Sequence, residues 1–213
     1  MELAEEISQF YADPFGFVRF AFPWREPGPL AEYDGPDVWQ REVLEEIGAD
    51  IRARGFDGVR AVEALREAVA SGHGIGKSAL VAWLVCWIMS TRPGAIGTVT
   101  ANTFIQLESK TWAQIKRWAK LCITSHWFVI SVSRMARIGA EDSWFCKPQT
   151  CKEENSEAFA GQHAASSTSF YIFDEASAIP DSIWQVAEGG LTDGEPMFFA
   201  FGNPTRSSGK FYR

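Results

Sequence analysis

The sequence has no excess of basic residues. It carries 20 Lys and Arg against 27 Asp and Glu, a formal net charge of −7, and its isoelectric point is about 5.1. Broad, charge-driven binding to nucleic acid needs Lys and Arg massed on one face. The composition therefore excludes a generally basic DNA-binding surface, and any contact with DNA must be local or shared between subunits.

Cysteine is scarce, and its spacing does not match that of zinc sites. The histidines at 126 and 163 also lack partners at metal-binding spacing. We expect no metal site made by protein ligands alone, and free thiols in a reducing cytosol. The four cysteines are Cys86, Cys122, Cys146 and Cys151.

Long hydrophobic runs are missing as well. The most apolar stretch, Ala79 to Met89, has 11 residues, whereas a helix that crosses a bilayer needs about 20. The first six residues are acidic and lack the basic start of a secretory signal. We therefore expect a cytoplasmic protein with no membrane partner.

The length of 213 residues and the hydrophobic content of 46% suit one sizeable α/β domain. Residues 1–36 mix proline with large aromatic side chains and predict an irregular N-terminal strap, and residues 37–213 would form the domain itself. Apolar periodicity and turn residues predict helices at 38–47, 77–90 and 103–123, strands at 95–100, 127–132, 170–173 and 197–201, and a polar hairpin or loop at 140–161. Residues 60–70 have a helical composition, but a phosphate-binding loop must follow a strand, so the glycine-rich stretch described next predicts a strand at 67–70.

A glycine-rich stretch precedes one of these helices and reads Ser-Gly-His-Gly-Ile-Gly-Lys-Ser. In such a loop, backbone N–H groups converge on phosphate oxygens, the Lys offsets their charge and the last hydroxyl holds Mg²⁺. The pattern G-x-x-x-x-G-K-[ST] has glycine where this chain has serine, so the match is a variant, and a glycine-rich turn is the alternative. We predict a phosphate-binding loop of Ser71, Gly72, His73, Gly74, Ile75, Gly76, Lys77 and Ser78, with no chemistry for the His73 ring.

A second motif, Phe-Tyr-Ile-Phe-Asp-Glu at 170–175, delivers two carboxylates to the end of a buried strand. Open α/β sheets bind ligands at the carboxyl ends of their strands. We interpret the motif as a Walker B element in which Asp174 holds Mg²⁺ and Glu175 polarises the attacking water as general base. A solvated loop start is the alternative for Asp-Glu taken alone.

Two amides are further candidates. Asn203 follows the apolar strand at 197–201 and would sense the γ-phosphate or the catalytic water, although Gly-Asn-Pro is also a common turn. Gln40 starts the first clear helix, and an amide that donates and accepts together suits the edge of adenine. In isolation a surface position explains Gln40 equally well.

An arginine near the γ-phosphate often contributes several orders of magnitude to phosphoryl transfer. The glycine-rich loop contains none, and Arg134 and Arg137, just after an apolar strand, are the candidates. A solvated surface position is the alternative for both.

Taken in order, the motifs resemble the ATPase domain of the large terminase subunits of tailed phages. The stretches that carry the resemblance are Gln40, SGHGIGKS, TANT, EAFAGQHA, FYIFDEASAIPDSIW and FGNPTRSSGKFYR. The serine in place of the first Walker glycine is familiar in that family. The resemblance implies an α/β fold of the P-loop NTPase class, of the ASCE type, with a mostly parallel central sheet and helices on both faces.

The resemblance also implies a function. Such a protein hydrolyses ATP with Mg²⁺ to drive double-stranded DNA into procapsids, as a homo-oligomeric ring that works with the portal protein and the small terminase subunit in the cytoplasm of the infected host cell. By this resemblance Gln40 would contact adenine, Lys77 the β- and γ-phosphates, Ser78 and Asp174 the Mg²⁺, Glu175 the water, and Asn203 would be the coupling residue. Family members continue into a nuclease domain whose carboxylate cluster this sequence does not supply, so ATP hydrolysis without DNA cleavage is expected.

Two rival interpretations stay open. A helicase-like ATPase lobe of the DEAD type also pairs a phosphate loop with Asp-Glu and an upstream Gln, but here Asp-Glu-Ala-Ser and Gly-Asn-Pro stand in place of the helicase signatures. A nucleotide-binding assembly factor without turnover is the other rival, and an intact Glu175 argues against it.

Overall fold

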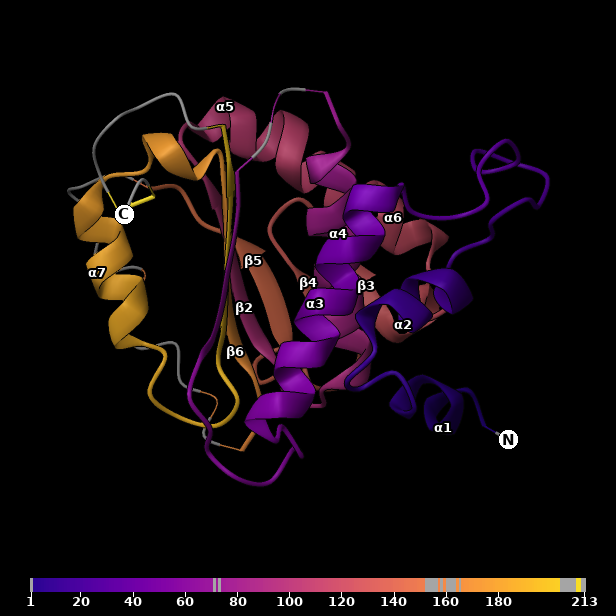
Figure 1. Cartoon of the computed structure of the whole chain (residues 1–213), viewed down its shortest axis with the longest axis horizontal. Coiled ribbons are helices and arrows are strands. Elements are labelled where there is room, and N and C mark those ends of the chain that lie inside the picture. Colours follow the sequence, from indigo (N-terminus) through magenta and orange to yellow (C-terminus); the bar gives the residue numbers. More distant parts are fainter. Residues whose placement is uncertain are drawn as a thin grey trace.

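The computed structural model describes residues 2–70, 72, 74–151, 157, 159, 164, 166–203 and 210–211. A seven-stranded sheet forms the middle layer and helices cover both of its faces. Figure 1 shows α7 on one face of the sheet and α3, α4 and α6 on the other. The predicted α/β class with a mostly parallel sheet is confirmed.

The helices and strands alternate along most of the chain. The α-helices are α1 Leu3–Ser8, α2 Pro14–Ala21, α3 Val38–Arg54, α4 Lys77–Thr91, α5 Phe104–Gln106, α6 Ala113–Leu121 and α7 Asp181–Gly189. Shorter elements are the π-helix η1 Leu107–Trp112 and the 3-10 helices η2 Ser125–Trp127 and η4 Ala176–Ala178. The strands are β1 Leu65–Ala70, β2 Ile96–Ala101, β3 Phe128–Ile130, β4 Met135–Arg137, β5 Phe145–Pro148, β6 Ser169–Asp174 and β7 Met197–Gly202.

The order of strands determines where the motifs meet. The sheet runs β1-β7-β6-β2-β5-β4-β3, and only the pairings of β3 and β4 are antiparallel. The strand before the phosphate loop, β1, is thus separated from the Walker B strand β6 by β7, the additional strand that defines the ASCE type. Because β1, β7 and β6 are parallel, the residues that follow them gather at one edge of the sheet.

Burial explains why the central strands read as continuous apolar runs. All six residues of β6 and of β7 are buried. A hydrophobic core lies on each face of the sheet, and the side chains of β6 alternate between the two. Phe170 and Ile172 pack in the core beneath α3 and α4, and Tyr171 and Phe173 pack in the core beneath α7. A strand covered on both faces has no polar face to alternate with.

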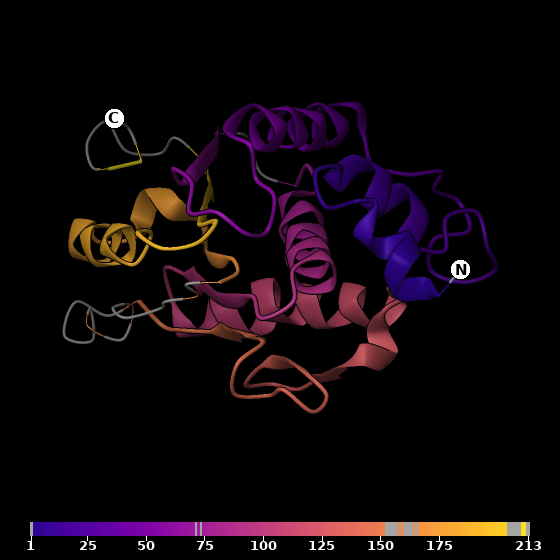
Figure 2. The same cartoon turned by 90° about the horizontal axis from the view of Figure 1, so that it is seen from below.

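The N-terminal strap was predicted to be irregular, and that prediction is wrong for two stretches of it. Helices α1 and α2 lie there (Figure 2, indigo). Pro14 does not break α2 because it occupies the first turn, where its missing N–H is not needed, and the Asp13 carboxylate accepts from the Gly16 N–H at 2.9 Å. Phe17 and Val18 of α2 are fully buried, whereas Phe20 is 40% exposed.

Other predictions need adjustment. The helix expected at 103–123 exists from 104 to 121, but its middle is π-helical. Phe104, an apolar residue of this run, is 56% exposed. Within the polar stretch expected to be a hairpin or loop, β5 pairs antiparallel with the preceding strand β4, and it also pairs with β2 inside the sheet. The strand expected at 127–132 shortens to β3. No helix among the described residues is long and apolar enough to cross a membrane.

Candidate nucleotide-binding site

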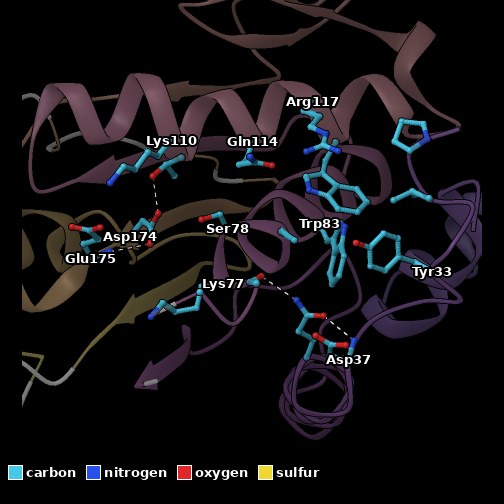
Figure 3. Close-up of a pocket in the computed structure, with 18 of the residues that line it drawn as sticks. Tyr33, Asp37, Lys77, Ser78, Trp83, Lys110, Gln114, Arg117, Asp174 and Glu175 are labelled. Atoms are coloured by element: carbon cyan, nitrogen blue, oxygen red, sulfur yellow. Dashed lines mark hydrogen bonds between the residues drawn. The ribbon is translucent and has the colours of Figure 1, made fainter. Parts of the chain in front are cut away.

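A cavity of about 610 Å³ opens where the predicted motifs meet, at the carboxyl edge of the sheet. Its floor is the phosphate loop and the residues that follow β6 and β7. Its roof is the helical run from α5 to α6, and the N-terminal segment from Trp24 to Asp37 closes one side (Figure 3). A volume of this size suits a drug-sized or nucleotide-sized ligand.

The phosphate loop has the backbone that its glycines predict. Gly74 and Gly76 have φ values of +74° and +91°, a region that favours glycine. At Gly76 a Cβ would also come within 2.8 Å of the Gln40 Nε2 atom. Gly76 is the N-cap of α4, so the positive end of a 15-residue helix faces the cavity. Ser71 and His73 lie outside the described residues.

Lys77 joins the first motif to the third. Its Nζ atom donates to the Gly72 carbonyl at 2.8 Å and to the Asn203 Oδ1 atom at 2.5 Å. Desolvation lowers the pKa of Lys77, and the nearby carboxylates of Asp174 and Glu175 act in the opposite direction. The structure thus brings Lys77, Asn203, Asp174 and Glu175 to one cavity, as the order of motifs predicted.

The two Walker B acids differ in their surroundings. Asp174 is 6% exposed, and burial raises the pKa of its carboxyl group, while hydrogen bonds from Thr111 and from the Glu175 N–H act to lower it. Glu175, the residue before η4, has a φ of +52°, in the left-handed region, which is strained for a residue with a side chain. Strained backbone at a cavity wall is typical of functional sites.

A divalent cation bound with a nucleotide fits the oxygen groups present. The hydroxyl of Ser78 and the carboxylate of Asp174 both line the cavity, and Mg²⁺ prefers such hard oxygen ligands while keeping phosphate oxygens and waters. Among the described residues no group of three or more His, Cys, Asp or Glu could hold a metal alone. The fit is therefore to a metal shared with a ligand.

Gln40 lies beside the phosphate loop and is 4% exposed. Its Oε1 atom accepts from the Asp37 N–H at 2.8 Å, and its Nε2 atom donates to the Gly76 carbonyl at 3.0 Å. The next side chain, Trp39, donates from Nε1 to the Ile75 carbonyl at 3.1 Å. In this structure the start of α3 braces the phosphate loop.

Within one chain, the two candidate arginines are held away from Lys77. Arg134 donates from Nη1 to the Glu141 carbonyl at 3.2 Å, at the start of β4. Arg137 donates to the Trp127 carbonyl at 2.9 Å, with its guanidinium between the rings of Trp127 and Trp144. As far as the described residues show, the cavity lining includes neither arginine. A role for either in hydrolysis stays a prediction.

Sequence reasoning missed the roof of the cavity. Besides Thr111, four polar side chains of the helical run line the cavity, and three of these four are labelled in Figure 3. Their spacing of four, four and three residues is a helical stripe that the sequence already displayed. The sequence reasoning also missed the N-terminal wall, formed by Trp24, Leu30 and Tyr33. The roof residues are Gln106, Lys110, Gln114 and Arg117.

No protein-family model matches the sequence. The probable terminase large subunit of Enterobacteria phage P7 is 31% identical over 205 residues, a match that covers 89% of this chain and 38% of that protein. The chain thus spans well under half of this relative's length.

Two solved structures share the fold. The large terminase of bacteriophage HK97 superposes with a TM-score of 0.61 at 12% identity, covering 97% of this chain and 39% of that chain. The ATPase domain of the large terminase of Thermus phage P74-26 superposes with a TM-score of 0.52 at 19% identity, covering 83% and 68%.

Proposed function

Because this chain is a relative of phage large terminase subunits and has the P-loop fold of their ATPase domains, we propose that it hydrolyses ATP to drive double-stranded DNA into procapsids. The resemblance drawn from the motifs is confirmed at the level of the family. The observation that carries the proposal is the meeting of Lys77, Asn203, Asp174 and Glu175 in one cavity at the N-terminus of α4.

The phosphate end of the site follows from these groups. The α4 N-terminus and Lys77 attract the β- and γ-phosphates, and Gly74 and Gly76 allow the loop backbone to approach them. A bound Mg²⁺, held by Ser78 and Asp174, supplies charge that offsets the phosphates. Glu175, which lines the same cavity as Lys77, acts as general base for the attacking water. Asn203, which follows β7, would sense whether the γ-phosphate is present.

The nucleoside end lies toward the N-terminal segment. Tyr33 is 59% exposed and lines the cavity together with Asp37 and Gln40 (Figure 3). An aromatic face suits stacking with a base, and carboxylate and amide groups suit its hydrogen-bonding edge. Gln40 would contact adenine with the hydrogen-bonding capacity that remains beyond the Asp37 N–H and the Gly76 carbonyl.

The proposal includes partners beyond the nucleotide. A homo-oligomeric ring on the portal protein, working with the small terminase subunit in the host cytoplasm, would place Arg134 or Arg137 opposite the site of a neighbouring subunit. The Arg134 side chain is 43% exposed and accessible to such a neighbour. Residues 37–213 would be the ATPase domain in this scheme, with residues 1–36 as a strap; DNA cleavage is no part of what we propose for these residues.

The test measures ATP turnover by the purified chain with and without double-stranded DNA, beside Lys77→Ala. We expect turnover that rises with double-stranded DNA, and loss of ATP affinity in the variant by a hundredfold or more, on the order of 3 kcal/mol, because a half-buried cationic partner of the phosphates is removed. Lys120→Ala, on the exposed side of α6, is the matched control and should behave as wild type.

Three outcomes separate the rivals. Stimulation by single-stranded nucleic acid in preference to duplex DNA would favour the helicase-like lobe. ATP binding without turnover, even with DNA, would favour the assembly factor. Equal ATP affinity in wild type and Lys77→Ala would contradict the assignment of the phosphate loop itself.

A further inference from the structure

The roof helix departs from α-helical geometry at one place. Between α5 and α6, the six residues of η1 form a π-helix. A π turn adds a residue to the helical turn, so it changes which side chains share a face, and such turns are frequent at functional sites. The irregularity lies directly over the Walker B carboxylate.

Two successive side chains of η1 have different partners. The Thr111 hydroxyl donates to the Asp174 Oδ2 atom at 2.6 Å, and the indole of Trp112 donates to the Ser131 carbonyl at 3.0 Å. Thr111 is 2% exposed and Trp112 is fully buried. A threonine inside a helix commonly bonds to the carbonyl one turn earlier, whereas this one reaches a carboxylate 63 residues away in the sequence.

The hydrogen bond fixes one side of the carboxylate. The Asp174 Oδ1 atom accepts from the Glu175 N–H at 3.0 Å, and Oδ2 accepts from Thr111. Because the two donors act on different oxygens, they hold the plane of the carboxylate as well as its position. Each oxygen has a second lone pair, which leaves the group able to bind a further partner from the cavity.

We propose that Thr111 is a positioning residue for the divalent cation of the nucleotide, because its hydroxyl holds the Asp174 carboxylate in the orientation that binds the metal. This inference rests on the proposed nucleotide site. Groups that orient a metal ligand through a hydrogen bond commonly change metal affinity by ten- to a hundredfold when removed. The π turn is then the device that brings the hydroxyl of a roof helix onto a strand of the floor.

The hydrogen bond between Thr111 and Asp174 also connects the helical roof of the cavity with strand β6 in its floor. Lys110 and Gln114, which flank Thr111 on the roof, line the cavity in which the nucleotide would lie (Figure 3). Thr111 would therefore connect a metal bound by Asp174 to the roof helix through this hydrogen bond. A threonine that merely filled space would have no such link to metal binding.

The test uses the whole chain and a fluorescent ADP analogue, whose binding is measured first in EDTA and then across a Mg²⁺ titration. Thr111→Val removes the hydroxyl and keeps the shape, and Thr111→Ser keeps the hydroxyl. Thr124→Val is the matched control, because Thr124 is 1% exposed and its hydroxyl is bonded to Ser90 at 2.8 Å, outside the residues that line the cavity. Thermal unfolding in EDTA shows whether each variant is folded.

We expect Thr111→Val to bind the metal-free analogue within about twofold of wild type and to need about tenfold more Mg²⁺ for half of the metal-dependent gain. Thr111→Ser should restore the wild-type titration, and Thr124→Val should match wild type in Mg²⁺ dependence despite a lower melting temperature. An unchanged Mg²⁺ titration in Thr111→Val, or the same shift in Thr124→Val, would overturn the inference while leaving the nucleotide site intact. Failure of wild type to bind the analogue at all would overturn the nucleotide site, and the inference with it.

Discussion

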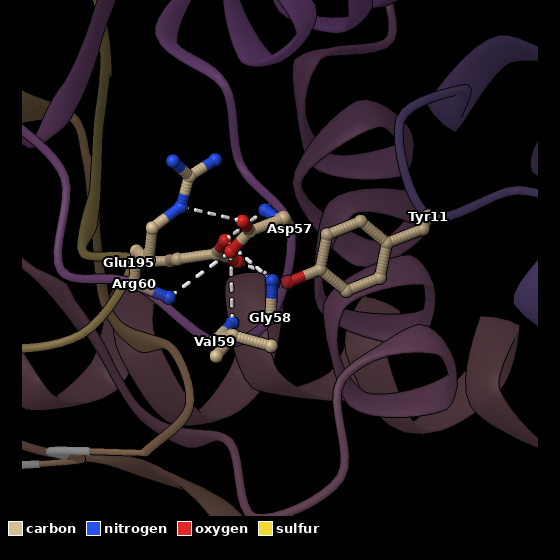
Figure 4. A network of polar contacts seen from close by, with 6 residues as sticks. All are labelled: Tyr11, Asp57, Gly58, Val59, Arg60 and Glu195. Atoms are coloured by element: carbon tan, nitrogen blue, oxygen red, sulfur yellow. Dashed lines mark hydrogen bonds and ion pairs between the residues drawn. The ribbon is translucent and has the colours of Figure 1, made fainter.

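Charged side chains have different surroundings at the two edges of the sheet: the amino edge, where the parallel strands begin, and the carboxyl edge, where they end. At the amino edge, Glu195 is 2% exposed and enclosed by protein donors: the Tyr11 hydroxyl bonds to one oxygen, and the N–H groups of Asp57 and Gly58 bond to the other at 2.5 and 2.7 Å (Figure 4). At the carboxyl edge, Asp174 and Glu175 face a cavity of about 610 Å³. One edge closes around its carboxylate, and the other leaves room for a ligand.

The positively charged side chains at the two edges differ in the same way. Arg92, next to the amino edge, is 1% exposed, lies over the rings of Tyr11 and Trp87 at 4.1 and 4.3 Å, and donates to the Tyr11 carbonyl at 2.7 Å. Lys77, at the carboxyl edge, lines the cavity and is held by groups of the site itself. The cation at one edge is thus enclosed by protein groups, and the cation at the other edge lines the cavity that we propose to bind the nucleotide.

The largest loss of stability is expected when the Glu195 carboxylate is removed from the amino edge. Glu195→Ala leaves a buried hydroxyl and two buried N–H groups without their acceptor, so we expect a loss of about 3 kcal/mol in the free energy of unfolding. Urea unfolding measures it. The affinity of the variant for ATP should stay within about threefold of wild type under conditions where it is folded.

Glu195→Gln is the milder control, because it keeps one acceptor oxygen, and it should lie between wild type and the alanine variant. A loss of less than about 0.5 kcal/mol in Glu195→Ala would show that the amino edge does not depend on this carboxylate.

A smaller effect on stability is expected from Glu67, which lies in β1 between the two edges. Burial, with the charges of Glu46 and Asp50 on α3, raises the pKa of Glu67 to about 7. Because folded Glu67 then binds a proton more tightly than in the unfolded chain, where its ordinary pKa is 4.5, the contribution of Glu67 to stability is fully present at low pH and is lost as pH rises from about 4.5 to 7. Glu67→Gln should remove this part of the pH dependence.

Screening by solvent reduces the effect, since Glu67 is only partly buried, and we expect Glu67→Gln to stabilise the protein by about 1 kcal/mol at pH 8. Urea unfolding at pH 5 and at pH 8 checks it. A variant as stable as wild type at pH 8 would show that the strand tolerates the charge.

The carboxyl edge was far easier to predict than the amino edge. Motif context correctly placed a strand before the phosphate loop against the helical composition of residues 60–70 and put Asp174 at the end of a buried strand. Phosphate binding demands fixed residue types at fixed spacing, so it leaves a local signature. The network around Glu195 joins residues 11, 57–58 and 195, and no local pattern announces a contact across 184 positions.

The remaining errors have physical causes. Prolines and aromatic residues suggested an irregular N-terminus, but Pro14 starts a helix and the apolar side chains bury themselves against the core. Thr111, which donates to Asp174, lies in the π-helix η1, and helical periodicity cannot show where a helix takes an extra residue. The stretches at 158, 160–163 and 204–209, which contributed to the resemblance, lie outside the described residues.

The most direct test of the account is steady-state ATP turnover in wild type and Glu175→Gln, with ATP affinity measured in both. The account predicts similar affinity, within about threefold, and a fall in turnover of about a thousandfold, because the amide cannot accept the proton of the attacking water. Wild type that binds ATP but turns it over no faster than Glu175→Gln would contradict it.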